Sequence, residues 1–247
     1  RASFETGMFQ LGGHALYLTT DATQLRRGEP LSDTARVLSR YAQGIMARVY
    51  SHDQVQEIQK FSRVPVINGL SNYLHPCQIL SDLFTLWEAK GKLKGLHVAY
   101  LGRPNNVSNS LLLGCTKMGV HITLYTPNHF SEEPLVWKEA LHNARKSHAH
   151  MRIAHAIDKG IEEMDFLYTD SWVSMHQHEP SHWIRKRFEA FQVNEALLKK
   201  CKPSVKVLHD LPAKREWEIT SNVLDGKQSI AWEQAENRLH AQKALLA

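Results

Sequence analysis

The strongest constraint on the fold is an alternation of strand-like and helix-like segments that runs along the whole chain. Apolar runs typical of strands occur at residues 45–50, 64–67, 96–101, 121–125, 166–168 and 205–208. Segments typical of helices lie between them, at residues 32–40, 53–61, 77–91, 109–118 and 133–146. Such alternation is typical of parallel sheets covered by helices, so the sequence predicts an α/β fold with two doubly wound parallel-sheet domains.

The long segment at residues 77–91 separates the two domains, because its apolar residues recur at helical spacing over more than three turns. We expect a first domain at residues 1–78 and a second domain at residues 92–229. The last segment, residues 230–247, is helical and is expected to dock back onto the first domain.

The first domain looks truncated at its front. Residues 2–11 resemble the inside of a helix that a glycine pair stops, yet no helix start signal precedes them. A short strand is expected at residues 15–19, and Ser32 or Asp33 is expected to cap the helix that follows. We therefore expect that the sequence begins part-way through a longer protein.

Composition excludes several classes of protein. The 30 basic and 25 acidic residues are scattered, whereas a nucleic-acid-binding protein concentrates its lysines and arginines on one face. Cys77, Cys115 and Cys201 lie too far apart for a zinc pattern and are odd in number, which indicates a reducing compartment and no metal. No apolar run reaches the roughly 18 residues of a membrane helix, and no signal peptide opens the chain.

Polar residues that suit anion and carbonyl binding follow the strand-like segments of the first domain. Arg48 lies inside an apolar run, as either an edge-strand surface residue or a planar fork of donors for a phosphate or carbonyl oxygen. Pro76 is favoured at a helix start, so His75 and Gln78 are expected to flank a helix N-terminus. They are either ordinary capping residues or ligands for an anion at a helix N-terminus.

Two carboxylates follow strand-like segments of the second domain. Asp170 follows the run at residues 166–168, and Asp210 follows the run at residues 205–208. Ligands of open α/β sheets bind at the carboxyl ends of the strands, and carboxylates there favour an amine-bearing ligand. Either segment is also compatible with an ordinary polar loop.

The order of these segments resembles the ornithine transcarbamylase family from the first residue to the C-terminus. The shared motifs, in family order, are Arg1-Ala2-Ser3-Phe4-Glu5-Thr6-Gly7, Gln10-Leu11-Gly12-Gly13-His14, Ser32-Asp33-Thr34-Ala35-Arg36-Val37-Leu38, Ala47-Arg48-Val49-Tyr50, Asn68-Gly69-Leu70-Ser71, His75-Pro76-Cys77-Gln78, Leu80-Ser81-Asp82-Leu83, Asn105-Asn106, Asp170 with Ser174-Met175, His209 with Leu211-Pro212, and Glu236-Asn237-Arg238.

The resemblance implies a carbamoyltransferase that needs no metal or organic cofactor. In that family an N-terminal domain binds carbamoyl phosphate and a C-terminal domain binds the amino acceptor. The acceptor nitrogen attacks the carbamoyl carbon and phosphate leaves, so catalysis depends on positioning and on stabilising the oxyanion. Family members are trimers with active sites between subunits, which implies a homotrimer here. Bacterial members are cytoplasmic and animal members lie in the mitochondrial matrix, so we expect a cytoplasmic protein, or a mitochondrial one in a eukaryote.

The resemblance assigns five residues to carbamoyl phosphate. Arg1 is the last residue of the phosphate-binding loop and contacts the phosphate. Arg48 bridges the phosphate and the carbonyl oxygen, while His75 and Arg238 donate to the carbonyl oxygen. Gln78 accepts from the carbamoyl NH2 group. These roles agree with the residue types, since an anion needs fork donors and a planar carbamoyl group needs both donors and an acceptor.

The resemblance also assigns residues to the amino acceptor. Asp170 pairs with the α-ammonium group and Asn106 holds the α-carboxylate. The other acceptor-side positions are Ser174, Met175, His209 and Leu211.

The chain departs from the family pattern in three places that bear on activity. The Ser-x-Arg-Thr part of the phosphate loop is missing, because the sequence starts at Arg1. Asp210 replaces a cysteine that lies beside the attacking amine, so it selects another cationic acceptor, accepts a proton or reports lost ornithine activity. His176 replaces a glycine in the loop over the acceptor, and Gly102-Arg103-Pro104 replaces Gly-Asp-x.

These departures leave alternatives open. Ornithine is the default acceptor, and a related diamine or diamino acid is the next hypothesis. A non-catalytic paralogue that binds ligands or partner subunits is the alternative from another class. A nucleotide-binding oxidoreductase is a distant third, because residues 101–106 follow a strand but lack the G-x-G-x-x-G pattern, and Pro104 removes an amide that a phosphate cradle needs.

Overall fold

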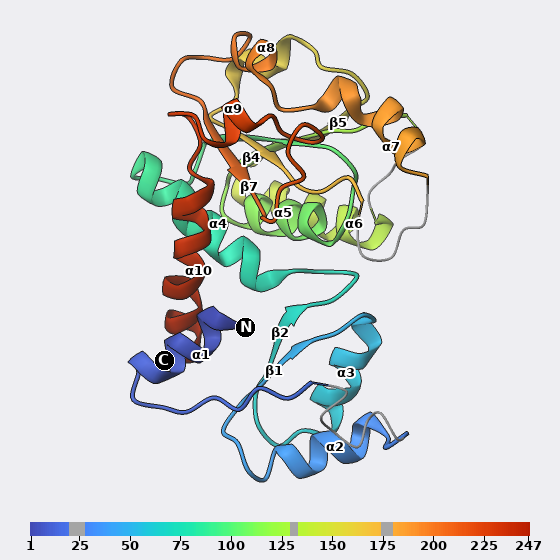
Figure 1. Ribbon diagram of the computed structural model, residues 1–247, viewed down its shortest axis with the longest axis vertical. Helices are drawn as coiled ribbons and strands as arrows, with labels where there is room; N and C mark the ends of the chain where they lie inside the picture. Colours follow the sequence, from blue (N-terminus) through green and yellow to red (C-terminus); the bar gives the residue numbers. More distant parts are fainter. Residues whose placement is uncertain (20–27, 129–132, 174–179) are drawn as a thin grey trace. The chain divides into compact units, whose positions relative to one another are not determined.

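A computed structural model describes residues 1–19, 28–128, 133–173 and 180–247 (Figure 1). The chain forms two compact units, one made of residues 1–77 and 238–247 and the other of residues 78–237. Both sheets are parallel. The predicted α/β class is therefore confirmed.

The larger unit is built on a five-stranded parallel sheet with the order β5-β4-β3-β6-β7. Its strands are β3 (His97–Leu101), β4 (His121–Tyr125), β5 (Met151–Ala154), β6 (Phe166–Thr169) and β7 (Lys206–His209). The chain winds outward from β3 in one direction and then returns to add β6 and β7 on the other side. The order therefore reverses between β3 and β6, as in doubly wound sheets.

Helices cover both faces of this sheet, so its strands are nearly continuous apolar runs. Helices α5 (Asn106–Lys117) and α6 (Pro134–Ser147) pack on each other, and Figure 1 shows them beside the sheet. The other face packs against short elements that follow β6. These are η4 (Glu189–Phe191), α8 (Glu195–Leu198) and α9 (Ser221–Leu224), and η3 (Lys159–Glu163), which precedes β6, packs there as well. Helix α7 (Ser181–Phe188) packs in a separate cluster, against Trp172.

The smaller unit has a two-stranded parallel sheet, β1 (Ile45–Arg48) with β2 (Val66–Leu70). Helices α2 (Leu31–Leu38) and α3 (His52–Phe61) pack on each other beside it. Helix α1 (Ala2–Gln10) lies against the last turns of α10, where Lys243 Nζ donates to Gln10 Oε1 at 2.8 Å. The Cβ atom of any larger residue at Gly7 would lie 3.1 Å from Lys243 Cγ, which shows how closely the two helices approach.

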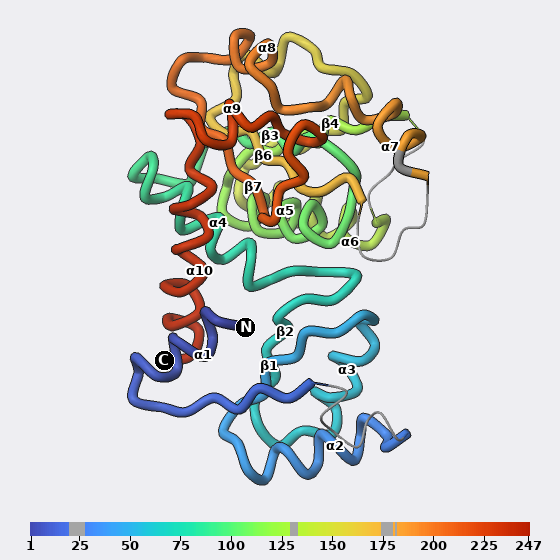
Figure 2. The backbone as a smooth tube through the Cα atoms, in the orientation of Figure 1, coloured from blue at the N-terminus to red at the C-terminus, as the bar shows by residue number. Residues whose placement is uncertain are grey.

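Two long helices run through the points where one unit ends and the other begins. Helix α4 (Pro76–Lys90) starts at the predicted proline, and α10 (Ala231–Leu246) is the predicted final helix. Within the larger unit the two helices lie side by side, as the chain path in Figure 2 shows. Ser81 Oγ of α4 donates to the Gln234 carbonyl of α10 at 3.0 Å.

Two predictions about local structure are wrong. Residues 15–19 form no strand, because none of the strands in the described part of the chain pairs with their backbone, and Leu16 is 76% exposed. Helix α2 begins after Pro30 without a side-chain cap, so neither Ser32 nor Asp33 caps it. The sequence patterns also failed to indicate β5, a partly exposed edge strand that is only four residues long.

Three histidines form a ladder at the amino-terminal edge of the larger sheet. The ring of His121 lies 4.5 Å from the ring of His97 and 4.9 Å from that of His150. His121 Nδ1 accepts a hydrogen bond from the His150 backbone N–H at 2.8 Å. Burial, and then the two neighbouring histidines, lower the pKa of His121. The native state therefore favours the neutral ring.

Because the pKa of His121 is lower in the native state than in the unfolded chain, protonation destabilises the fold. The contribution is fully present above the unfolded pKa, near 6.5, and is lost as the pH falls through the native value. We expect His121→Asn, which keeps an acceptor for His150, to lose less unfolding free energy between pH 7 and pH 5 than the parent. Urea denaturation at several pH values measures this, and the exposed His142→Asn is the control. An identical pH dependence in His121→Asn and the parent would contradict the prediction.

Candidate functional site

The sheet of the larger unit has its topological switch point between β3 and β6. These strands pair in parallel, with Leu101 opposite Thr169, and the chain order reverses at this point. In open α/β sheets, ligands bind beyond the carboxyl ends of the strands at such a reversal. The next pair continues the same edge, with Thr169 opposite His209. Residues directly after these strands therefore share one edge.

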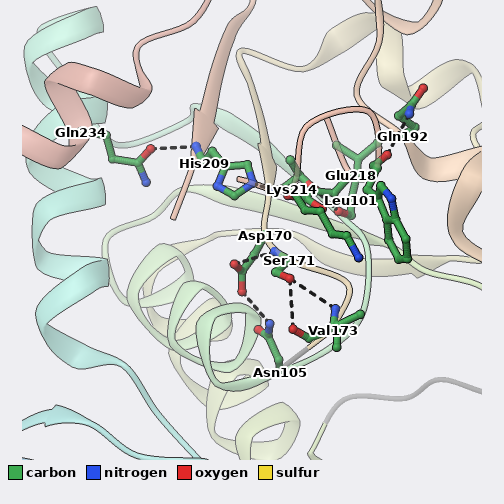
Figure 3. A network of polar contacts seen from close by, with 12 residues as sticks. Leu101, Asn105, Asp170, Ser171, Val173, Gln192, His209, Lys214, Glu218 and Gln234 are labelled. Atoms are coloured by element: carbon green, nitrogen blue, oxygen red, sulfur yellow. Dashed lines mark hydrogen bonds and ion pairs between the residues drawn. The ribbon is translucent and has the colours of Figure 1, made fainter. Parts of the chain in front are cut away.

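Asn105 and Asp170 meet at this edge (Figure 3). Asn105 caps α5, and its Oδ1 accepts from the backbone N–H groups of Val107 at 2.9 Å and Ser108 at 3.0 Å. Its Nδ2 donates to Asp170 Oδ2 at 2.7 Å. The backbone N–H of Ser171 donates to Asp170 Oδ1 at 2.7 Å. One side chain thus both starts the helix and orients the carboxylate.

The environment of Asp170 is set mainly by burial, which raises the pKa of its carboxyl group. The nearby His209 and the hydrogen bond from Asn105 act in the opposite direction. A partly buried carboxylate of this kind binds an ammonium group well, because the cation replaces water that burial has removed.

His209, at the end of β7, is fully buried and pairs with an equally buried Glu218. His209 Nε2 lies 3.1 Å from Glu218 Oε1, and both side chains are 0% exposed. The same oxygen accepts the backbone N–H of Lys214. His209 Nδ1 and Glu218 Oε2 are buried and have no hydrogen-bond partner within the described part of the chain.

The smaller unit gathers positive charge around His75. Arg48 is the last residue of β1 and is exposed, and Arg238 is the first residue of α10 that belongs to this unit. Burial, and then the charges of Arg238 and Arg48, lower the pKa of His75 to about 3. A neutral imidazole next to guanidinium groups can donate to a carbonyl oxygen without adding charge.

Arg238 is held by Gln242, one turn later on α10 and only 1% exposed. A guanidinium group has donors only, so the Gln242 amide must turn its oxygen toward it. In that orientation Gln242 accepts from Arg238 Nε at 2.9 Å and Nη2 at 2.8 Å, and its nitrogen donates to Ser3 Oγ. Gln242 therefore links Arg238 to the helix that follows Arg1.

Gln78 lies in the first turn of α4 and is 3% exposed. Its Nε2 donates to Asp82 Oδ1 at 2.9 Å. The spacing of four residues places both side chains on one face of the helix. Gln78 thus belongs to a buried network and not to a solvent-exposed helix start.

The predicted site residues fall into two groups. Arg1, Arg48, His75 and Arg238 belong to the smaller unit, and Gln78, Asn106, Asp170, His209, Asp210 and Leu211 belong to the larger one. Ser174 and Met175, as well as the substituted His176, lie outside the described residues. Asn106 is the first residue of α5, next to the cap Asn105.

Glu218 and Asp82 are two buried acids that the sequence patterns did not single out. Glu218 follows no strand and belongs to a run of alternating charges, so no pattern marks it as buried. Asp82 had a detectable signal, namely its spacing of four residues from Gln78.

No group of three or more His, Cys, Asp or Glu side chains could hold a metal ion in residues 1–19, 28–128, 133–173 and 180–247. In those same ranges no helix is long and apolar enough to cross a bilayer.

Family models match both parts of the chain. Residues 1–88 match the carbamoyl-P binding domain of aspartate/ornithine carbamoyltransferase, and residues 94–247 match the Asp/Orn binding domain. The chain belongs to the aspartate/ornithine carbamoyltransferase family. The resemblance found in the sequence motifs is therefore confirmed.

Relatives in this family cover the whole chain. The anabolic ornithine carbamoyltransferase of Pyrococcus furiosus is 49% identical over 247 residues, which are 100% of this chain and 78% of that protein. An ornithine carbamoyltransferase of Bacillus cereus is 48% identical over 246 residues, with the same coverage.

Solved carbamoyltransferase structures share the fold. The chain superposes on ornithine carbamoyltransferase from Pyrococcus furiosus with a TM-score of 0.96, covering 100% of this chain and 79% of that one, at 49% identity. The enzyme from Gloeobacter violaceus gives a TM-score of 0.90 at 41% identity, with 100% and 80% covered.

Glu218 is expected to stabilise the fold through His209. Glu218→Leu removes the carboxylate that faces His209 Nε2 and leaves buried donors unpaired, which should lower the unfolding free energy by about 2–5 kcal/mol. Glu218→Gln keeps an acceptor oxygen and should lose less. Urea unfolding at pH 7 measures both variants, and a Glu218→Leu protein as stable as the parent would contradict the proposed pairing.

His75 is expected to stay neutral throughout the physiological range, because its pKa of about 3 lies far below the usual value. NMR spectra of ¹⁵N-histidine-labelled protein should show no titration of its ring between pH 8 and pH 5, with His75→Gln used to assign the signal. Arg238→Met removes a positive charge and should raise the pKa of His75, while burial keeps it below the ordinary value. A titration of His75 centred near pH 6.5 would refute this assignment.

Proposed function

We propose that the protein transfers the carbamoyl group of carbamoyl phosphate to the side-chain amine of ornithine and releases phosphate. The observation that carries this proposal is the identity of 49%, over the entire chain, with an ornithine carbamoyltransferase. The charge clusters in the two units add chemical support. One unit concentrates arginines suited to a phosphate, and the other places a carboxylate suited to an ammonium group at a strand end.

Carbamoyl phosphate is assigned to residues 1–78 together with the helix at residues 230–247. Arg1, Arg48 and Arg238 provide guanidinium donors for an anion, and Arg forks match phosphate oxygens in pairs. His75 donates from a neutral ring to the carbonyl oxygen. The oxygen becomes negatively charged in the tetrahedral intermediate, and donors fixed around it lower that barrier.

The amino acceptor is assigned to residues 92–229. Asp170 pairs with the α-ammonium group, and its fixed orientation by Asn105 supports that role. Asn106 holds the α-carboxylate at the start of α5, where backbone N–H groups and the helix dipole favour an anion. His209 and Leu211 flank Asp210, and Ser174 and Met175 complete the assigned positions.

The reaction requires an uncharged nitrogen. The side-chain ammonium group first loses a proton, and the free amine nitrogen forms a bond to the carbamoyl carbon. The bond from that carbon to the phosphate oxygen breaks, and the nitrogen gives up a second proton, which leaves with the phosphate or to solvent. The charge that builds up on the carbonyl oxygen and on the phosphate is stabilised by donors already in place. No group of the protein changes its oxidation state.

We further propose a homotrimer. Large apolar side chains of the smaller unit lie open to solvent, among them Phe9 at 80%, Tyr41 at 76% and Tyr50 at 67% exposure. Exposed apolar side chains of this size are compatible with an interaction surface between subunits. Sedimentation equilibrium should give three times the monomer mass, and a monomer at micromolar concentration would contradict the proposal.

A phosphate-release assay on the full-length protein tests the function. Carbamoyl phosphate with ornithine should give phosphate and an equal amount of a carbamoylated amino acid, whereas putrescine, lysine and shorter diamino acids should react more slowly. Faster phosphate release with another diamine than with ornithine would show that this diamine, and not ornithine, is the acceptor. No release with any amine would overturn the proposed enzyme activity.

Asp210 is expected to set the pH dependence of that reaction. Burial is the main cause that raises the pKa of the Tyr100 and Tyr168 hydroxyl groups. The Asp210 carboxylate, which lies near both, raises these pKa values further. A carboxylate beside the acceptor amine raises the pKa of that amine and lowers the fraction of free base.

Asp210→Cys should therefore raise kcat/KM for ornithine about tenfold near neutral pH and shift the pH profile about one unit toward acid. Asp210→Asn removes the same charge without a thiol and should shift the profile equally. An unchanged acceptor preference and pH profile in both variants would show that Asp210 is not the specificity element.

A further inference from the structure

A carboxylate that the proposed chemistry does not use lies buried behind Gln78. Asp82 is 1% exposed and accepts Gln78 Nε2 on its Oδ1 atom at 2.9 Å. The same oxygen accepts Gln234 Nε2 at 2.7 Å, and the Tyr168 hydroxyl donates to Oδ2 at 3.2 Å. A buried charge is costly unless donors surround it, so these three partners fix Asp82 in place.

This arrangement fixes the orientation of the Gln78 amide. A carboxylate only accepts hydrogen bonds, so the NH2 end of Gln78 must face Asp82. The carbonyl oxygen is then at the opposite end of the amide. A carbamoyl NH2 group needs an acceptor, and an amide turned the other way would present donors to a donor. The orientation of the Gln78 amide thus decides whether Gln78 attracts or repels a carbamoyl NH2 group.

The network also reaches the strand end that carries Asp210. Gln234 Oε1 accepts the backbone N–H of His209 at 2.9 Å, as Figure 3 shows. Gln234 Nε2 donates to the Tyr168 hydroxyl at 3.1 Å as well as to Asp82. A continuous chain of buried hydrogen bonds therefore joins Gln78 to the backbone at His209. Such networks rigidify their members when every atom is satisfied.

We propose that Asp82 is a positioning residue that, with Gln234 and Tyr168, orients the Gln78 amide and so makes the protein select carbamoyl phosphate over inorganic phosphate. This inference rests on the proposed function. It differs from a purely structural role in one measurable way. Loss of a structural network lowers stability and weakens both anions alike, whereas loss of positioning weakens only the anion that carries an NH2 group.

Asp82→Leu in the full-length protein is the decisive variant, because leucine has a similar shape but no acceptor. The KM for carbamoyl phosphate should rise about 10- to 100-fold, the usual effect of removing a partner that orients a ligand. The Ki of inorganic phosphate as a competitive inhibitor should stay within about threefold, the scatter expected of independent effects.

Asp82→Asn is the rescue variant. Its Oδ1 atom can still accept from Gln78 and Gln234, and its Nδ2 can donate to the Tyr168 oxygen. We expect the KM for carbamoyl phosphate to lie within about threefold of the parent. An Asp82→Asn protein as impaired as Asp82→Leu would show that the charge, and not the orientation of Gln78, matters, which would overturn the proposal.

A double-mutant cycle tests whether Asp82 acts through Gln78. In a Gln78→Ala background, Asp82→Leu should raise the KM for carbamoyl phosphate by no more than about threefold. The matched control is Thr85→Val on the same helix, which removes a buried hydroxyl that donates to the Ser81 carbonyl at 2.8 Å. Thr85→Val should change the KM for carbamoyl phosphate by the same factor in the parent and in the Gln78→Ala protein. Equal losses from Asp82→Leu in both backgrounds would also overturn the proposal.

Tyr168→Phe is the second variant, to be used if the Asp82→Leu protein does not fold. It removes one donor to Asp82 without changing the shape of the core, so the KM for carbamoyl phosphate should rise roughly threefold, with the Ki of phosphate unchanged. Equal weakening of both anions would reject positioning. An inactive parent would overturn the proposed function itself, whereas a fully active Asp82→Leu beside an active parent overturns the positioning role alone.

Discussion

The parallel pairing of β3 with β6 is the interaction on which the rest of the larger unit depends. It joins the two strands between which the order of the chain reverses, so Leu101 and Thr169 end at the same edge of the sheet, where ligands of open α/β sheets bind. Hydrogen-bonded strands lie about 4.8 Å apart, which fixes the distance between the residues that follow them. Asn105 and Asp170 meet across this pairing, and one hydrogen bond between them holds the acceptor-side carboxylate.

A second physical rule explains the interior of both units. A buried polar group needs a partner, and two buried acids of the larger unit, Asp82 and Glu218, each accept hydrogen bonds from more than one residue. Asp82 accepts from α4, α10 and β6, while Glu218 accepts from the end of β7 and from the backbone of Lys214. His75 follows the opposite course. Burial, together with the charges of Arg238 and Arg48, lowers its pKa and keeps its ring neutral.

The sequence predicted the elements that depend on local pattern. The start of α4 at Pro76 follows from proline chemistry, and the main strands follow from their apolar runs. The strand expected at residues 15–19 is absent because strand formation depends on a neighbour, which no local pattern reveals. Glu218 was missed for a related reason, since its partner His209 lies across a loop and only the folded chain joins them. Asp82 could have been found from its helical spacing to Gln78, although its bond to Gln234 spans most of the sequence.

Every described residue assigned to the amino acceptor lies at or just beyond the end of a buried strand. Asn106 begins a helix after β3, Asp170 follows β6, and Asp210 follows β7. The strands carry the folding free energy, whereas the residues that follow them carry the chemistry. Residues such as Asp210 can therefore change without altering the buried strands of the sheet. The fold can therefore be retained while the substrate preference of a carbamoyltransferase changes at a few positions along one edge of the sheet.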